Sequence, residues 1–164
     1  MRVYLSGGME HANEKIFVWR FEIEEWLKEN LNHLVFNPVV ETQKFLEENY
    51  PDIVNFRELK ETAPEKFTEI ISRIVERDIE AVKECDYIIC FWDESAEKGA
   101  GTQGEITLAK FLNKPIFLVS KFEFSKIPAW IIGCVDKIFY DFDELKDFLY
   151  KKFKSSYESN ESGD

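Results

Sequence analysis

The chain has 164 residues, of which 32 are acidic and 21 basic, giving a net charge of -11. This length suits one well-buried domain and is short for two. No block of Lys or Arg builds the positive stripe that contacts with a nucleic-acid backbone require, so we expect no nucleic-acid binding. A small anionic ligand remains compatible with the charge, because a few backbone N–H groups can bind a phosphate on an acidic protein.

The sequence carries no pattern typical of a leader peptide or a membrane span. We therefore expect a cytoplasmic protein without membrane contacts. The three cysteines are odd in number and match no metal-ligand spacing, so we expect buried free thiols and no metal site. They are Cys85, Cys90 and Cys134.

Short runs of Val, Ile, Leu and Phe alternate with segments of helical periodicity along the chain. The expected strands are 3–6, 34–36, 87–91, 116–119 and 137–140, and the expected helices are 15–31, 64–84, about 105–112 and 142–153. Residues 39–63 are expected to be irregular, with short helices, and are a candidate lid because they are long for a connection.

This alternation predicts an α/β fold, a single doubly wound, flavodoxin-like domain with a five-stranded parallel sheet. The domain is expected to span residues 1–153, and the polar residues 154–164 to form a disordered tail. In this fold the ends of the first and third strands meet at the switch point. The loops after Ser6 and Trp92 should therefore face each other.

Residues 99–105 are expected to form a glycine-rich loop at the carboxyl end of the third strand, where ligands of such sheets bind. Glu105 has two interpretations. Thr102 and Glu105 fit the capping-box spacing, in which both side chains satisfy backbone N–H groups. Alternatively, Glu105 is a carboxylate nucleophile held ionised by the helix dipole, and Gly101 lets a ligand approach the backbone.

Asp78 lies on the apolar stripe of the expected long helix, in line with Ile74 and Val82. A buried carboxylate needs a partner. Either Arg77 or Arg73 forms a salt bridge with it, or the helix is rotated and exposes it. The functional alternative is a carboxyl group with a raised pKa that serves as an acid beside a ligand.

Tyr4 lies in the middle of the first strand, where the simplest interpretation is core packing with a satisfied hydroxyl. Gly7 and Gly8 follow this strand. They form either a tight turn or a backbone that bends around a substrate.

These features together resemble the nucleoside 2-deoxyribosyltransferase family, which includes the 2'-deoxynucleoside 5'-phosphate N-hydrolases. The shared pattern comprises residues 3–8, Asp78 eight residues before Asp86, and residues 101–105 followed by Ala109, Lys114 and Pro115. The resemblance covers residues 1–140 and is carried mainly by the first strand and residues 78–120.

The resemblance implies that Glu105 is the nucleophile, Asp78 the acid/base near the nucleobase, and Tyr4 the phenol that positions the nucleophile. The implied reaction cleaves the N-glycosidic bond of a 2'-deoxynucleoside through a covalent glycosyl-enzyme. Transfer to another base or hydrolysis follows, and no cofactor is needed. Family members commonly oligomerise, so we expect a homodimer or larger homo-oligomer that binds a small-molecule nucleoside or nucleotide.

One position departs from the family pattern. Six residues before the nucleophile the transferases have aspartate and the nucleotide hydrolases serine, but this chain has Gly99. Asp93, Glu94, Ser95 or Glu97 would then take its place. The expected substrate-binding residues are Ser6, Gly7, Gly8, Gly101, Thr102 and Asp93.

The acidic residues near the expected site favour a deoxynucleoside over its 5'-monophosphate. A 5'-monophosphate N-hydrolase and a non-catalytic nucleotide-binding domain of the same fold stay as alternatives.

Overall fold

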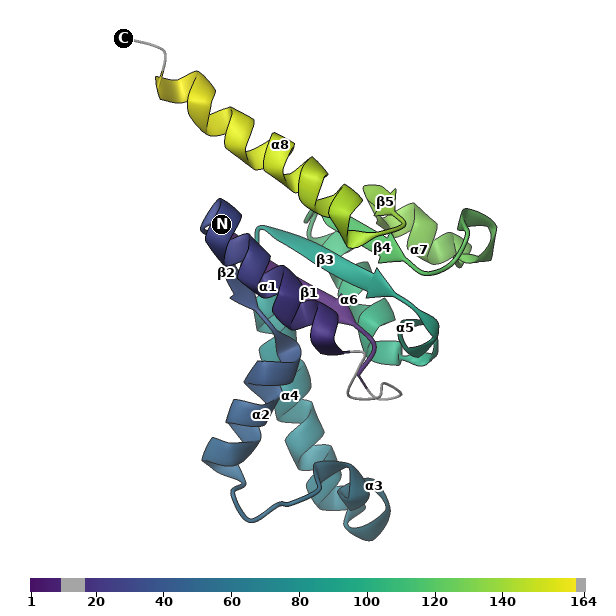
Figure 1. The fold of residues 1–164 in the computed structure, drawn as a ribbon. Coiled ribbons are helices and arrows are strands. Elements are labelled where there is room, and N and C mark those ends of the chain that lie inside the picture. Colours follow the sequence, from purple (N-terminus) through teal and green to yellow (C-terminus); the bar gives the residue numbers. More distant parts are fainter. Residues whose placement is uncertain (10–16, 162–164) are drawn as a thin grey trace.

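The computed structural model describes residues 1–9 and 17–161, with side chains as far as residue 154. Its centre is a five-stranded, all-parallel sheet in the order β2-β1-β3-β4-β5 (Figure 1). The strands are β1 (Arg2–Gly7), β2 (Leu34–Phe36), β3 (Tyr87–Trp92), β4 (Ile116–Ser120) and β5 (Lys137–Phe139). This order is that of flavodoxin-like proteins, so the predicted fold class is confirmed.

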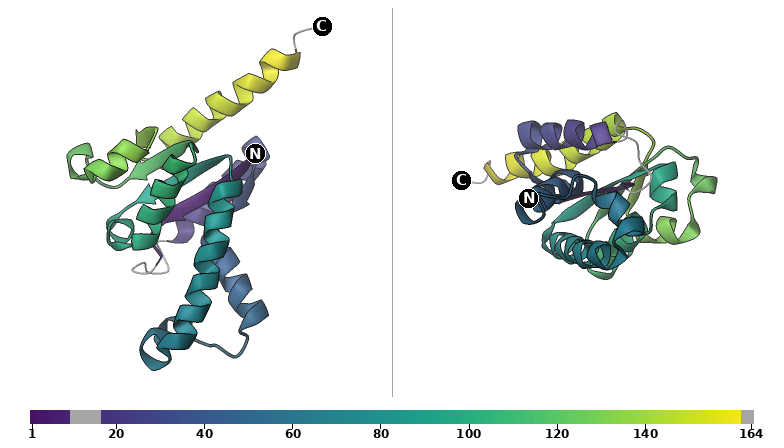
Figure 2. Two further views of the ribbon diagram at one scale, coloured as in Figure 1. Left: turned by 180° about the vertical axis from the view of Figure 1, so that it is seen from behind. Right: turned by 90° about the horizontal axis from the view of Figure 1, so that it is seen from below.

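Helices cover both faces of the sheet, as Figure 2 shows. One face carries α1 (Val18–Leu31) and α8 (Phe142–Glu161). The other carries α4 (Pro64–Glu84), α6 (Ala100–Phe111) and α7 (Ala129–Cys134). The central strand β3 is buried along its whole length, which explains why its sequence is apolar throughout rather than alternating. Among the described residues, no helix is long and apolar enough to cross a membrane.

Strands β1 and β3 end side by side, with Ser6 paired to Cys90 and Gly7 paired to Phe91. Because side chains alternate between the faces of a sheet, Tyr4 and Ser6 point toward α4 and α6. The intervening Leu5 points toward α1. The carboxyl end of β1 therefore lies at the switch point, as expected for a ligand site.

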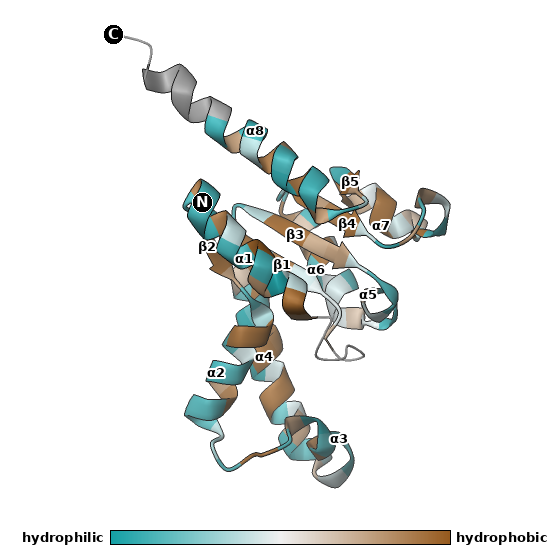
Figure 3. Cartoon of the chain, in the orientation of Figure 1, coloured by the Kyte–Doolittle hydropathy of each residue, from teal (hydrophilic) through white to brown (hydrophobic). Residues whose placement is uncertain are grey.

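An arm projects away from the sheet (Figures 1 and 2). It consists of α2 (Pro38–Asn49), the 3-10 turn η2 (Phe56–Glu58), α3 (Leu59–Thr62) and the first half of α4. Figure 3 shows hydrophobic residues on α2 and α4 where the two helices approach each other. The expectation that residues 39–63 are irregular was wrong for residues 39–49, which lie in α2, whereas η2 and α3 are short helices of the kind expected. The Asn37 side chain accepts a hydrogen bond from the backbone of Val39 and begins a regular helix there.

The prediction that residues 99–105 form a glycine-rich loop was also wrong. A short helix, α5 (Glu94–Lys98), follows β3, and α6 begins directly after Gly99. Glu105 consequently lies in the second turn of α6 and not at its start. At the other end of the chain, α8 continues to Glu161 instead of ending near residue 153.

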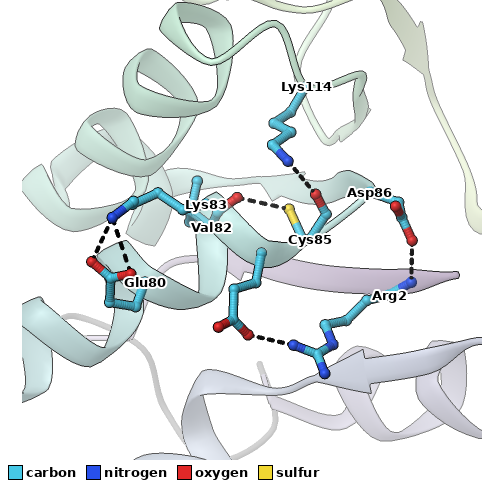
Figure 4. A network of polar contacts seen from close by, with 8 residues as sticks. Arg2, Glu80, Val82, Lys83, Cys85, Asp86 and Lys114 are labelled. Atoms are coloured by element: carbon cyan, nitrogen blue, oxygen red, sulfur yellow. Dashed lines mark hydrogen bonds and ion pairs between the residues drawn. The ribbon is translucent and has the colours of Figure 1, made fainter.

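A network of polar contacts lies at the amino-terminal ends of the strands (Figure 4). The backbone N–H of Arg2 donates to the Asp86 carboxylate at 2.6 Å, and Lys114 Nζ donates to the Cys85 carbonyl at 2.7 Å. These contacts connect the end of α4 with the starts of β1 and β3, opposite the carboxyl ends of the strands. At the other end of the same two strands, Ser6 lies beside Cys90.

Candidate active site

The carboxylate of Glu105 is held by two hydroxyl groups from β1. Tyr4 Oη donates to Oε1 at 2.8 Å, and Ser6 Oγ donates to Oε2 at 2.5 Å. The strand presents both donors because residues two apart lie on the same face. Glu105 as a residue is only partly buried, at the carboxyl ends of the strands.

Burial raises the pKa of Glu105 to about 7, and Asp78 adds to this rise when it is ionised. The hydrogen bonds from Ser6 and Tyr4 and the positive charge of Arg20 act in the opposite direction. At neutral pH the carboxyl group is therefore near its midpoint. A nucleophile must be ionised, so every group that favours the charged form affects the amount of reactive enzyme.

The capping-box interpretation of Glu105 was wrong. Thr102 is buried within the first turn of α6, and Gly99 occupies the N-cap position without a side-chain hydrogen bond. The Glu105 carboxylate reaches β1 instead of the helix backbone. The helix dipole acts mainly on the first turn, so hydroxyl groups rather than the dipole are the near partners of this carboxylate.

Tyr4 is fully buried, and its ring stacks on Phe36 with 5.3 Å between the ring centroids. Burial raises the pKa of Tyr4 well above its ordinary value, and the charge of Glu105 adds to the effect. The phenol therefore remains a hydrogen-bond donor at any pH of interest. It can orient Glu105 but does not compete with it for ionisation.

Asp78 pairs with Arg77, whose Nε and Nη2 reach Oδ1 at 3.0 and 2.6 Å. Of the two predicted partners, Arg77 is the correct one, because Arg73 bonds Tyr50 and Asn49 in the arm. The Asp78 side chain is 17 % exposed. Burial raises its pKa, although the neighbouring Arg77 acts to lower it. The salt bridge and a proton-donating role are thus compatible.

Gly8 passes so close to Ser95 that a Cβ there would lie 1.9 Å from the Ser95 hydroxyl oxygen. Asp93 Oδ1 accepts hydrogen bonds from the backbone N–H groups of Ser95 and Ala96 and from the Ser95 hydroxyl, and so caps α5. Both Asp93 and Ser95 are buried. The loop after β1 and the start of α5 therefore pack together, as the predicted switch point required.

The other expected substrate-binding residues lie in different environments. Ser6 is engaged with Glu105, Gly101 is exposed on α6, and Thr102 faces the interior. Gly7 packs against Arg20 and Trp19. The part of the loop formed by residues 10–16 lies outside the described residues. No cluster of metal-ligating side chains occurs among the residues that are described.

Arg20 was missed in the sequence. Its guanidinium is fully buried, and Nη2 donates to the Gly7 carbonyl at 2.8 Å. The signal that identified Asp78 was present here too, because Arg20 is spaced as part of an apolar stripe with Ile23 and Leu27.

A cavity of about 470 Å³ lies between the arm and the loop after β1. Arg57 bridges its two sides by donating Nη2 to the Met9 carbonyl at 2.6 Å. Thr42, in its wall, accepts a hydrogen bond from Arg77, the partner of Asp78. The arm is therefore connected to the candidate site through the Asp78 ion pair.

Comparisons with known proteins bear on this fold. No protein-family model matches the chain, and no curated protein matches it in sequence. A 2-deoxyribosyltransferase from the psychrotolerant bacterium Bacillus psychrosaccharolyticus superimposes with a TM-score of 0.63 and 21 % identity, over 89 % of this chain and 90 % of that one. The CMP N-glycosidase BcmB of Clostridium botulinum gives 0.48 and 20 %, over 91 % and 98 %. Over most of its length, the chain therefore has the fold of a 2-deoxyribosyltransferase.

Proposed function

We propose that this protein cleaves the N-glycosidic bond of a 2'-deoxynucleoside and transfers the deoxyribosyl group to another base. The observation that carries the proposal is the Glu105 carboxylate, held by the hydroxyl groups of Tyr4 and Ser6 at the carboxyl end of β1. A carboxylate fixed at this end of the strands can attack the anomeric carbon of a bound sugar. The shared fold of the deoxyribosyltransferase supports the same chemistry.

In the proposed first step, a Glu105 oxygen forms a bond to C1' while the bond from C1' to the base nitrogen breaks. The base leaves with the electron pair of that bond, and the protonated Asp78 supplies a proton to it. The raised pKa of Asp78 favours the protonated form that this step requires. The product is a glycosyl ester of Glu105.

In the second step, a nitrogen of the incoming base attacks C1' and releases the Glu105 carboxylate. The proton lost by that base returns to Asp78, so the enzyme ends in its starting state. Tyr4 and Ser6 bind the carboxylate more strongly than the ester, because hydrogen bonds to an ionised acceptor are stronger. They thereby favour release of the sugar in this step.

A 5'-monophosphate N-hydrolase is the second candidate, and the position of Asp93 favours it. The resemblance implies that a carboxylate binds the 5'-hydroxyl of a deoxynucleoside substrate. Because this chain has Gly99 where the transferases have aspartate, another residue would have to supply that carboxylate. Asp93 instead uses Oδ1 to cap α5. Turnover of a deoxynucleoside and of its 5'-monophosphate, each with and without a free acceptor base, distinguishes the two activities.

Glu105→Ala tests the proposal. We expect cleavage to fall by orders of magnitude while the far-ultraviolet circular dichroism remains that of the folded protein. The matched control is Glu25→Ala, an exposed glutamate on α1, across the sheet from α6. Products are separated by chromatography as free base and exchanged nucleoside. Near-normal turnover by Glu105→Ala would refute the nucleophile assignment.

A further inference from the structure

Arg20 is a buried cation at the same strand end as Glu105. Its side chain is fully buried, and Nη2 donates to the carbonyl oxygen of Gly7 at 2.8 Å. Nε and Nη1 have no hydrogen-bond partner in the described part of the chain. The guanidinium also lies over the Trp19 ring, 4.6 Å from its centroid. A buried charge that contacts only a neutral carbonyl and aromatic rings is still costly, so its retention calls for a partner of opposite charge.

The backbone of β1 connects Arg20 to Glu105. Gly7, which accepts the hydrogen bond from Arg20, directly follows Ser6, which donates to Glu105. A Cβ at position 7 would lie 3.0 Å from Arg20 Nη2 and 3.0 Å from the Trp19 ring. Glycine at this position thus lets the guanidinium lie against the strand. The charge approaches from the α1 face, whereas Glu105 lies on the α6 face.

Among the residues that the structure describes, the charges around Glu105 leave Arg20 as the cation that can balance it. In the described parts of the chain, 1–9 and 17–161, the titratable and charged groups that interact with the site are Tyr4, Arg20, Arg77, Asp78, Cys90 and Asp93. Tyr4 and Cys90 are neutral, since burial raises the pKa of each. Arg77 is already paired with Asp78.

We propose that Arg20 is a positioning residue that favours the ionised form of Glu105, acting across the end of β1 through the opening that Gly7 leaves. This proposal rests on the proposed function of Glu105 as nucleophile. Burial lowers the pKa of Arg20 to about 10, so the guanidinium remains charged near neutral pH. Its field lowers the free energy of the carboxylate relative to the carboxylic acid.

The test is the titration of the Glu105 carboxyl group in the free protein. The carboxyl carbon is followed by NMR after labelling glutamate with carbon-13, and the resonance is assigned by its loss in Glu105→Gln. We expect Arg20→Met to raise the titration midpoint by about one pH unit, as removal of a nearby opposite charge does. Arg20→Lys retains the charge and should keep the midpoint close to that of the wild type.

Lys114→Met is the matched control. Lys114 also donates to a backbone carbonyl, that of Cys85, but at the amino-terminal ends of the strands (Figure 4). We expect it to lower the melting temperature without moving the Glu105 midpoint. If Arg20→Met does not fold, Gly7→Ala replaces it. The added methyl group displaces the guanidinium, so the midpoint should shift in the same direction by a smaller amount.

An unchanged midpoint in Arg20→Met would overturn the proposal. So would a selective increase in KM for a 5'-monophosphate without a shift, because Arg20 would then bind a substrate anion. The titration needs no turnover. A wild-type protein that cleaves no nucleoside or nucleotide, yet shows the expected shift, would refute the proposed function while leaving the electrostatic role of Arg20 intact.

Discussion

Ser6→Ala removes one of the two hydroxyl groups that hold the Glu105 carboxylate. A hydrogen bond to a charged group contributes about 1.5 kcal/mol at the lower end of its range. Since one pKa unit corresponds to about 1.4 kcal/mol, the loss should raise the pKa of Glu105 by about one unit. The starting value is about 7. The ionised fraction at pH 7 should then fall from about one half to about one tenth.

This change predicts a roughly fivefold loss of kcat/KM at pH 7 that disappears near pH 9, where Glu105 is ionised in both proteins. The assay measures kcat/KM between pH 5 and pH 9.5. The matched control is Ser120→Ala, a buried serine at the end of β4 whose hydroxyl donates to the Phe122 carbonyl. An acidic limb that stays in place in Ser6→Ala, or a loss that is equal at every pH, would refute the reasoning.

Two further predictions concern Glu105 and Asp78. The pKa of Glu105 is about 7 in the folded protein, above its unfolded value, so ionisation destabilises the fold as pH rises from about 4.5 to about 7. Glu105→Gln should therefore raise the melting temperature at pH 8 and change it little at pH 4.5; an equal change at both values would contradict this. Asp78→Asn should slow cleavage of bases that leave only when protonated, and remove the alkaline limb of their pH profile. It should retain activity on bases that are good leaving groups. A uniform loss on all substrates would indicate instead that breaking the Arg77 pair disorders the site.

The fold was predictable because its signals are local. Each strand is a short run of Val, Ile, Leu and Phe, and the helix from Pro64 to Glu84 has both an apolar stripe and a proline in its first turn. The region after Pro38 was less predictable. Its helix packs against α4 through aromatic rings and arginines, such as Arg73 over Phe45, and such contacts depend on tertiary structure.

The start of α6 illustrates why glycine is a weak guide. Gly101 and Gly104 indicated a loop, since glycine lowers helix stability by about 1 kcal/mol relative to alanine. Both nevertheless lie within α6, and a Cβ at either would meet no atom within 4 Å. Buried residues on the inner face of the helix, including Ile106, outweigh that cost. The packing of this inner face against the sheet also orients the Glu105 side chain toward β1.

The arrangement of the site explains which of its residues a sequence can reveal. Tyr4 and Glu105 each lie in a segment that resembles the family pattern, and their contact needed only the strand to lie beside the helix that contains Glu105. Arg20 acts across the sheet, from a helix on the other face, and only the missing side chain of Gly7 brings it close. The sequence offered two interpretations of Gly7, a tight turn or a backbone that bends around a substrate, and neither included a close approach of a buried guanidinium. Asp78 and Arg20 are both charged residues within the apolar stripe of a helix. Such positions can be recognised in a sequence as candidates for a functional role before a structure is known.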